Sequence, residues 1–414
     1  MIILKNATLI DGSGAPPLNN AVIVVRGDKI ESVTSNVNDA DDECLSNAKA
    51  EPESADSDII IDLKGKYLLP GLIDLHVHFG GTDGFEYPGL SDRKASYDFL
   101  HSRLESLKWG VTTVRSAGDF TPDIFDLRDE VDAGKHISPR IIAAGKMIQA
   151  KGGHPLSTVF SGLPEIAENA CVLVDENTDI AVEIGTLVSQ GADWIKAYIS
   201  EVNKLDYPAR IPRISGEKIK KIVEISHKLD KPCMIHVDNI SQMREAAEAG
   251  ADTIEHVFAI GSTDTEIDDS LIQLLKEKGI TVVPTLISIK KHDNMGENMP
   301  RVYNVLLDEV RKLVDCGVIV GVGTDSPIPF NEIGESLHEE MAELVNCGMS
   351  PLEAITAATS GNARILRMSD KIGRISPLLL ADLIVVDGNP LDDIENTKNI
   401  SLVVANGKIV LDNI

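Results

Sequence analysis

The feature that most constrains this chain is an alternation, between residues 72 and 330, of short apolar runs rich in Val and Ile with longer amphipathic stretches. Eight runs have the length and composition of buried parallel strands: 72–78, 111–116, 140–145, 193–199, 232–238, 253–258, 280–286 and 318–324. Eight strand-then-helix units in about 250 residues predict an α/β fold, a parallel (β/α)8 TIM barrel. A doubly wound sheet is the rival, but its usual phosphate loop, G-x-G-x-x-G, does not follow the first run.

The stretches between these runs carry the spacing of amphipathic helices. Residues 216–229 place apolar side chains at 219, 222, 223 and 225, close to the helical period. Residues 241–251 and 269–279 follow a similar pattern, and each has a glycine where helices often end. The motif Ser-Pro-Leu-Glu at 350–353 begins a further helix, with Ser as the N-cap, Pro at the first position and Glu completing a capping box.

Both ends of the chain show strand-like patterns, in residues 1–35 and from 381 onward. They predict a small β-sandwich domain built jointly from residues 1–65 and 366–414, beside a catalytic barrel of residues 66–365. Residues 36–58 hold eight acids and one Lys with few large apolar side chains. We expect a solvated loop there, and an acidic interaction segment is the alternative.

The composition narrows the class of partner. Lys and Arg number 39 and Asp and Glu 65, and the formal charge of −26 argues against nucleic acid or an anionic membrane as a partner. The five cysteines are scattered without a C-x-x-C pair, which argues against a disulfide framework or a zinc finger. The first residues lack a leader pattern, and no run approaches ~18 apolar residues. We therefore expect a reduced, cytoplasmic protein, as a monomer or a homo-oligomer, and the composition alone does not identify its partner.

Polar side chains gather where the predicted strands end. His76 and His78 close the first run, and on a strand residues i and i+2 point to the same face. Alone they are compatible with two ordinary histidines, because a single pair at this spacing has low specificity. Four further residues end later runs: Lys196, His236, His256 and Asp325. Imidazole and carboxylate bind Zn²⁺ and similar ions, so convergence of these groups at the C-terminal rim of a barrel predicts a metal site.

The ordered set of motifs resembles the amidohydrolase superfamily of metal-dependent hydrolases, in the subgroup related to imidazolonepropionase and metal-dependent dipeptidases. The resemblance spans nearly the whole chain and rests on LLPGLIDLHVH, TIEH, VVPTL, GTDSP, SPLEAITAATSGNARIL, ADLIVVDGNPLDD and VVANGKIV, in this order. The family fold is a metal-bearing (β/α)8 barrel with a β-sandwich from both termini, in agreement with the strand pattern. One departure is SPLLLADL, where relatives usually have Gly and a basic residue before ADL.

This resemblance implies a site with two divalent ions, most commonly Zn²⁺. His76, His78 and Asp325 would bind one ion. His236 and His256 would bind the other.

Lys196 resembles the lysine that bridges the two ions in dinuclear members, where CO₂ converts it to a carbamate. A bare ammonium there would repel both cations, whereas a carbamate supplies two oxygens and a negative charge. Its formation needs a neutral amine, which burial and nearby cations favour. If Lys196 stays unmodified, a single-metal site with the same histidines remains open.

The implied reaction is hydrolysis of an amide C–N bond. Hydroxide held between ions about 3.5–4 Å apart attacks the carbonyl group, and Asp325 takes the proton and delivers it to the leaving nitrogen. No G-x-S-x-G elbow is present, which argues against a serine hydrolase. The expected substrate is a small peptide-like molecule or an N-acyl amino acid, as for Xaa-Pro dipeptidases and carboxypeptidases. Hydrolysis of a cyclic amide or a lactone, deamination at a single metal and a non-catalytic scaffold are the alternatives.

Three residues are expected to contact the substrate. His154 ends a Gly-Gly-His motif that contacts substrate in this subgroup, so it is a candidate oxyanion donor; a loop histidine held by backbone is the alternative. Tyr198 lies two residues beyond Lys196 on the same strand face, where it lines the pocket or packs under a loop. Asp238 stands where dipeptidase-like relatives often have Tyr or His. An ionised Asp only accepts hydrogen bonds, so it would receive a substrate ammonium or guanidinium group.

Overall fold

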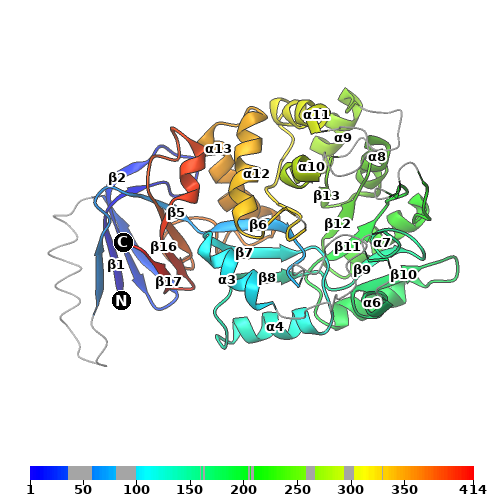
Figure 1. The fold of residues 1–414 in the computed structure, drawn as a ribbon, viewed down its shortest axis with the longest axis horizontal. Helices are drawn as coiled ribbons and strands as arrows, with labels where there is room; N and C mark the ends of the chain where they lie inside the picture. The colour runs from blue at the N-terminus through cyan, green and yellow to red at the C-terminus, as the bar shows by residue number, and fades with distance from the viewer. Residues whose placement is uncertain are drawn as a thin grey trace. The chain divides into compact units, whose positions relative to one another are not determined.

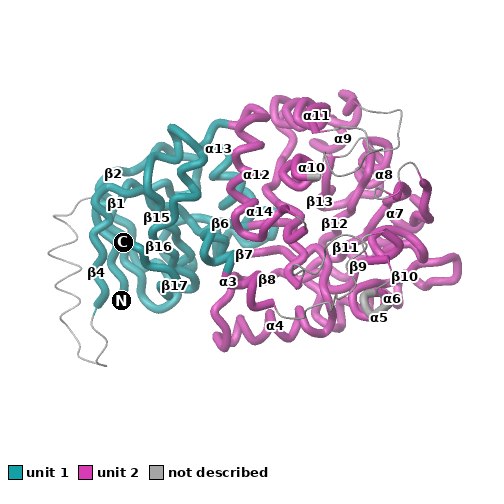
Figure 2. Tube along the Cα trace, viewed as in Figure 1, with its two compact units in different colours: residues 1–73, 105–112, 350–414 teal, residues 74–104, 113–349 magenta. Residues whose placement is uncertain are grey.

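The computed structural model describes the chain except for residues 36–57, 81–98, 159, 162–163, 204–205, 207–208, 258–265, 293–302 and 329. The acidic segment predicted at 36–58 therefore lies almost entirely outside the described residues. The chain divides into two compact units, coloured teal and magenta in Figure 2. Unit 1 comprises residues 1–73, 105–112 and 350–414, and unit 2 comprises residues 74–104 and 113–349.

Unit 1 is built on one eight-stranded mixed sheet that joins both ends of the chain. Its strands are β1 (Ile2–Leu9), β2 (Leu18–Arg26), β3 (Lys29–Thr34), β4 (Ile59–Asp62), β5 (Tyr67–Pro70), β15 (Leu383–Val386), β16 (Ile400–Ala405) and β17 (Lys408–Asp412). The order is β17-β16-β15-β5-β1-β2-β3, and β4 pairs with β1 in parallel. Alternate residues of these strands bury an apolar core around Leu4, Ile23 and Leu383. The strands predicted at both ends are confirmed, and they belong to a single sheet.

A helical segment of unit 1 begins at the capping box predicted from sequence. The Ser350 hydroxyl accepts a hydrogen bond from the backbone amide of Glu353. In return, the Glu353 carboxylate accepts a hydrogen bond from the backbone amide of Ser350 at 2.7 Å. The segment consists of α13 (Pro351–Thr356), the π-helical turn η2 (Ala357–Gly361) and α14 (Asn362–Ile365). Unit 1 also contains the 3-10 turn η3 (Ile394–Lys398).

Replacing the capping residue tests the contribution of this box. We expect Ser350→Ala to lower the free energy of unfolding by about 1 kcal/mol, because the first turn loses an acceptor for a backbone amide. Ser350→Asn keeps a capping oxygen and should stay within a few tenths of a kcal/mol of the wild type. Urea denaturation followed by circular dichroism measures both values. Equal stabilities of the Ala and Asn variants would contradict the prediction.

Unit 2 carries the parallel strands that were predicted from the apolar runs. A three-stranded sheet contains β6 (Leu72–Val77, entering from unit 1), β7 (Val111–Ser116) and β8 (Arg140–Ala143). A six-stranded sheet has the order β10-β9-β11-β12-β13-β14, from β9 (Met147–Ala150), β10 (Cys171–Val174), β11 (Ile195–Tyr198), β12 (Cys233–His236), β13 (Thr253–Glu255) and β14 (Thr281–Val283). Every residue of β11, β12, β13 and β14 is buried, as expected for strands covered on both faces.

Helices follow most of these strands. They are α3 (Leu100–Lys108), α4 (Asp123–Asp132), α5 (Pro164–Ala170), α6 (Ile180–Ser189), α7 (Gly216–Lys228), α8 (Ile240–Ala249), α9 (Asp269–Lys278), α10 (Leu286–His292), α11 (Tyr303–Asp315) and α12 (Glu335–Asn346). In Figure 1, α7 lies along β11 and β12, and α8 follows as the next helix. The helices predicted at 216–229, 241–251 and 269–279 are confirmed, and the last two end at glycines with positive φ.

The predicted eighth strand, 318–324, differs from the structure. Among the described residues this segment forms isolated bridges, Val320 with Val282 of β14 and, just beyond it, Ser326 with Val77 of β6. Its backbone still bonds to both neighbours: Val282 N donates to Ile319 O, and the Leu75 amide donates to Val322 O. The described strands therefore form two parallel sheets with this segment between β14 and β6, and not one continuous eight-stranded barrel.

Glycine explains the irregular backbone of this segment. A Cβ atom at Gly323 would lie 2.9 Å from the backbone nitrogen of His76 and 2.7 Å from a methyl group of Val283. The chain can pass this close to β6 only without a side chain. Two further strands, β9 and β10, were not predicted, because each is four residues long and lacks a clear alternation.

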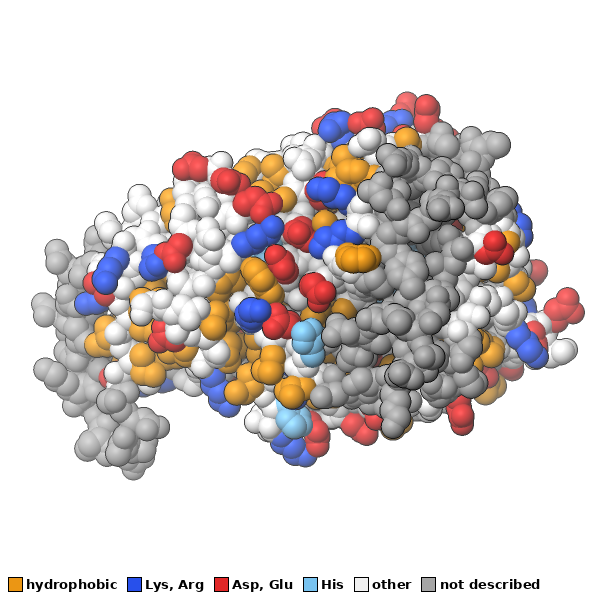
Figure 3. Space-filling view, in the orientation of Figure 1, with side chains coloured by type: hydrophobic (Ala, Val, Ile, Leu, Met, Phe, Trp, Pro, Cys, Tyr) orange, Lys and Arg blue, Asp and Glu red, His pale blue; other side chains and the backbone are white. Residues whose placement is uncertain are grey.

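The exposed surface agrees with the acidic, mixed composition. On the face drawn in Figure 3, basic side chains are interspersed with acidic ones among the described residues. No helix in the described part of the chain is long and apolar enough to cross a bilayer.

Candidate metal centre

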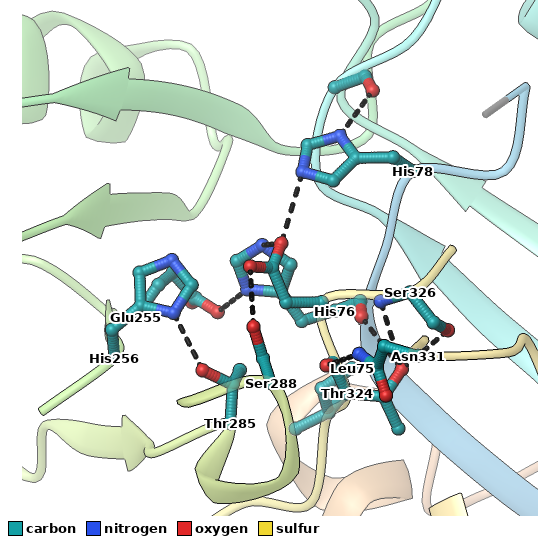
Figure 4. Close-up of polar contacts among 12 residues, drawn as sticks. Leu75, His76, His78, Glu255, His256, Thr285, Ser288, Thr324, Ser326 and Asn331 are labelled. Atoms are coloured by element: carbon teal, nitrogen blue, oxygen red, sulfur yellow. Dashed lines mark hydrogen bonds and ion pairs between the residues drawn. The ribbon is translucent and has the colours of Figure 1, made fainter. Parts of the chain in front are cut away.

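His76 and His78 lie at the end of β6, and the hydrogen-bond partners of each ring determine which ring nitrogen can bind a metal ion. His76 is fully buried, and its Nδ1 lies 2.6 Å from a carboxylate oxygen of Glu255. Burial alone would raise the pKa of Glu255, but the charge of Arg115 and the imidazole of His76 outweigh it and hold this pKa well below the ordinary value. An ionised carboxylate only accepts hydrogen bonds, so Nδ1 of His76 donates. In the neutral ring the lone pair is then on Nε2, which points toward the centre of the site (Figure 4).

His78 is oriented by a backbone carbonyl. Its Nδ1 donates to Gly118 O at 2.9 Å, and its Nε2 lies 3.3 Å from Asp325 Oδ1. Burial lowers the pKa of His78, but the Asp325 carboxylate and the charge of Asp119 raise it above the ordinary value. Asp119 also accepts the backbone amides of the two residues after His78, at 2.9 and 2.7 Å. The loop that leaves β6 is thus held against the segment that follows β7.

His256 and Asp325 are directed into the site by left-handed backbone. His256 has φ +73° and Asp325 has φ +60°, so each follows the extended segment at a sharp bend. The amide of His256 donates to Val283 O at 2.8 Å, and the amide of Asp325 donates to His76 O at 2.8 Å. His256 Nδ1 lies 2.7 Å from the hydroxyl of Thr285, which also has positive φ, +49°. Such conformations are rare outside glycine and cluster at functional sites.

The Asp325 carboxylate lies among the imidazoles. Its Oδ1 is 3.4 Å from His76 Nε2, and the Ser288 hydroxyl donates to its Oδ2 at 3.3 Å. Burial alone would raise the pKa of Asp325, but the imidazoles of His76, His78 and His256 outweigh it and hold this pKa well below the ordinary value. Asp325 is therefore an ionised acceptor in this arrangement.

Asp74 and Thr324 fix the backbone beneath these ligands. The Asp74 carboxylate accepts a hydrogen bond from the backbone amide of His76 at 3.0 Å and another from the hydroxyl of Thr324 at 2.7 Å. It thus ties β6 to the segment that carries Asp325. Burial raises the pKa of Asp74 to about 7, against the hydrogen bonds from His76 and Thr324.

Lys196 and His236 lie on the neighbouring strands β11 and β12. The His236 ring centre is 4.4 Å from that of His256 and 4.7 Å from that of Tyr198. Lys196 is fully buried, and its Nζ lies 4.8 Å from the centre of the Tyr198 ring. The charge of Lys196 contributes to lowering the pKa of His256, after burial and the charge of His236. Both residues therefore lie beside the cluster of imidazoles.

The three predicted substrate residues are all buried. The His154 ring centre lies 5.0 Å from that of His236 and 5.5 Å from that of Tyr198, which places His154 at the edge of the cluster. The Tyr198 ring lies beside those of His154 and His236, and its hydroxyl contacts the sulfur of Met147 at 3.2 Å.

Asp238 has protein partners on both carboxylate oxygens. Oδ2 accepts from the hydroxyl of Ser200 at 2.5 Å and from the amide of Glu201 at 3.2 Å, and Oδ1 lies 3.2 Å from His236 Nε2. These contacts do not favour the predicted binding of a substrate cation, and that role of Asp238 stays a prediction.

The donor groups fit a divalent ion. Ligand atoms of His76, His256 and Asp325 all lie within 4.8 Å of one another. Nε2 of His76 is buried and makes no hydrogen bond with the described residues. Two imidazole nitrogens and a carboxylate oxygen are the ligand types that Zn²⁺ takes from proteins. This group combines members of the two ligand sets implied by the resemblance, so the structure brings the sets together as one cluster.

Four contributing residues were missed from sequence: Glu255, Thr285, Ser288 and Asp74. A signal existed for three of them. Asp74 lies two residues before His76, and Glu255 directly precedes His256 within the TIEH motif. Thr285 belongs to the VVPTL motif, whereas Ser288 gave no signal, because a hydroxyl residue near a strand end is common in any sequence.

Imidazoles and a carboxylate that converge where parallel strands end form a possible metal site, a feature compatible with enzymes of the hydrolase class. Comparisons with known proteins identify the family. The family model described as "Amidohydrolase family" matches residues 67–410. The chain therefore belongs to the amidohydrolase family, and it is an enzyme of the hydrolase class.

Three relatives illustrate the range of this family. Ochratoxinase from Aspergillus niger is 27% identical over 425 residues, which cover 95% of this chain and 82% of that protein. A 5-methylthioadenosine/S-adenosylhomocysteine deaminase from Carboxydothermus hydrogenoformans is 23% identical over 426 residues, which cover 94% of this chain and 84% of that protein. The crystal structure of a Xaa-Pro dipeptidase with bound methionine has a TM-score of 0.81 and 27% identity, covering 99% of both chains.

Proposed function

We propose that this protein is a metal-dependent amidohydrolase that cleaves the amide C–N bond of a small peptide-like or N-acyl amino-acid substrate. The observation that carries the proposal is the convergence of His76, His256 and Asp325, whose ligand atoms lie within 4.8 Å of one another. The similarity to a Xaa-Pro dipeptidase and to ochratoxinase supports an amide or peptide bond as the target.

The proposed ion-binding groups are the six predicted from sequence: His76, His78, Lys196, His236, His256 and Asp325. We propose two ions, with Zn²⁺ as the native metal and Lys196 as a bridging carbamate. When bound, such ions would polarise a carbonyl group and favour ionisation of water at neutral pH. The burial of Lys196 supports the carbamate, because an ammonium group without water is disfavoured and the neutral amine reacts with CO₂.

The side chains of the protein would handle the protons. Asp325 would accept the proton of the attacking water and deliver it to the leaving nitrogen, while Ser288 holds its second oxygen. His154 would donate from Nε2 to the developing oxyanion. Thr158 Oγ1 lies 2.6 Å from His154 Nδ1 and 3.1 Å from Pro155 O. The hydroxyl has one proton, so it donates a hydrogen bond to only one of these two atoms. Donation by a neutral His154 therefore requires the Thr158 proton to point toward Nδ1.

We propose that residues 66–365 form a closed (β/α)8 barrel, with residues 1–65 and 366–414 as the accessory β-domain. The backbone bonds of segment 318–326 to β14 and β6 support closure on one side. On the other side, the amide of Asp193, just before β11, donates to Ala143 O of β8 at 2.8 Å.

Metal analysis tests the function and separates its alternatives. Protein stripped of metal and reloaded with Zn²⁺ and bicarbonate should hold two ions per chain and hydrolyse members of a library of dipeptides and N-acyl amino acids. The library should include cyclic amides and lactones, since the same centre attacks either bond. One ion per chain with release of ammonia from a heterocycle would favour the deaminase alternative, to which the relative from Carboxydothermus hydrogenoformans points. Absence of bound metal would support the scaffold alternative and refute the proposal.

A further inference from the structure

One arginine joins the strands that carry three of the proposed metal ligands. Arg115 of β7 is fully buried, and its Nε donates to Leu75 O, next to His76, at 2.6 Å. Its Nη1 donates to the hydroxyl of Thr253 on β13 at 3.1 Å. Its guanidinium carbon lies 4.5 Å from the centre of the Trp194 ring, just before β11. A single side chain thus contacts the elements that lead to His76, His256 and Lys196.

Glu255 connects this arginine to a ligand. Its Oε1 accepts from Arg115 Nη2 at 2.8 Å and from the Thr253 hydroxyl, and its Oε2 accepts from His76 Nδ1 at 2.6 Å. Arg115, Glu255 and His76 have no exposed surface. Both carboxylate oxygens of Glu255 therefore accept hydrogen bonds from the protein, and Figure 4 shows the contact between Glu255 and the ring of His76.

We propose that Arg115 and Glu255 form a positioning pair that fixes the tautomer and the ring orientation of His76 and thereby increases the affinity of the site for its metal ion. This inference rests on the proposed metal site. It assigns to these two residues a role outside the ligand set, since both are fully buried and bonded to protein groups.

Arg115 fixes both the charge and the direction of the Glu255 carboxylate. A buried carboxylate is stable only when it is paired and fully hydrogen-bonded, and the planar fork of Arg115 provides that pairing in a fixed direction. A carboxylate fixed in this way accepts a hydrogen bond from Nδ1–H of His76, so the lone pair that can bind a cation is on Nε2. A carboxylate behind a histidine ligand also makes the imidazole a stronger donor, and loss of such a partner typically costs 10- to 100-fold in metal affinity, as an order of magnitude.

Glu255→Gln tests the positioning role. The amide of Gln can either accept from Nδ1 or donate to it, so the tautomer is no longer fixed. We expect Zn²⁺ affinity, measured by competition with a chromophoric chelator, to fall about 10- to 100-fold. In the metal-free protein, ¹⁵N NMR of labelled histidine should show His76 protonated at Nδ1 in the wild type and a share of the Nε2-protonated form in the variant.

The matched control is Glu309→Gln on α11. Glu309 is also a buried carboxylate, and it accepts the amide of Ile267 at 2.7 Å. Among the described contacts it touches no proposed ligand. We expect its Zn²⁺ affinity and His76 spectrum to equal those of the wild type. A loss of affinity in this control as large as that of Glu255→Gln would attribute the effect to general destabilisation and overturn the proposal.

A second variant keeps the test valid if Glu255→Gln alone folds poorly, because it leaves a buried guanidinium without its anion. Glu255→Gln combined with Arg115→Met removes both charges and should recover thermal stability while the low Zn²⁺ affinity remains. Wild-type Zn²⁺ affinity and a wild-type His76 tautomer in this double variant would overturn the positioning role and leave the proposed function standing. If the wild-type protein binds no divalent ion, the proposed function fails, and the tautomer measurement on metal-free protein still decides whether the pair positions His76.

Discussion

Asp325→Asn should lower kcat/KM by about 10²–10⁴-fold while the metal content of the protein stays close to that of the wild type. The amide keeps an oxygen where Asp325 Oδ1 lies, 3.4 Å from His76 Nε2 and 3.3 Å from His78 Nε2, so a ligand atom is retained. It cannot accept the proton of the attacking water, because the neutral amide is a very weak base. Steady-state kinetics with the best substrate from the library, together with elemental analysis, measures both quantities.

The control for this substitution is Asp308→Asn. Asp308 is exposed on α11 and pairs with Arg311 at the surface, where a single ion pair contributes little to stability. Its variant should keep full activity and full metal content. An Asp325→Asn enzyme with more than a tenth of the wild-type rate would refute the acid–base assignment, and one that has lost its metal would show that Asp325 serves mainly as a ligand.

Lys196→Met should reduce the metal content from two ions per chain to one or fewer, and turnover should fall on the order of 10³-fold, which corresponds to about 4 kcal/mol of transition-state stabilisation. Met has a similar length and fits the buried position, so the substitution removes the nitrogen with little change in volume. Because the proposed bridge is a carbamate, wild-type protein loaded with ¹³C-bicarbonate should show a carbamate signal that this variant lacks.

Lys276→Met on α9 is the control. This lysine is exposed, and its Nζ donates to Cys316 O at 2.7 Å, away from the proposed ligands. Its variant should keep two ions and the carbamate signal. A Lys196→Met protein that holds one ion and retains its turnover would instead support the single-metal alternative, in which the lysine has no bridging role.

The elements with strong periodicity were predictable from sequence. The spacing in 216–229 predicted α7, and the glycines at 250 and 279 predicted where α8 and α9 end, because only a residue without a side chain readily adopts the left-handed cap. The capping box at Ser350 was predicted for the same local reason. The segment 318–324 was harder, since its composition is that of a strand while close passage past His76 at Gly323 interrupts regular pairing.

The candidate site was predictable in its membership but not in its geometry. His76, His256 and Asp325 were predicted from their positions at strand ends. The left-handed backbone of His256 and Asp325, however, is accompanied by tertiary hydrogen bonds that their amides donate to the carbonyl oxygens of Val283 and His76. Glu255 was missed because it belongs to the strand and faces the interior, where a carboxylate is stable only beside Arg115, 140 positions away in the chain. Pairings over such separations leave no local pattern.

The tight passage of Gly323 beside His76 also bears on how this enzyme can be redesigned. Laboratory libraries that vary position 323 would mostly yield misfolded chains, because a Cβ atom there would meet the main-chain nitrogen of His76 as well as a methyl group of Val283. Randomisation is better directed to the loops that follow the strands. Changes there can alter substrate specificity while the strands that carry the proposed metal ligands stay the same.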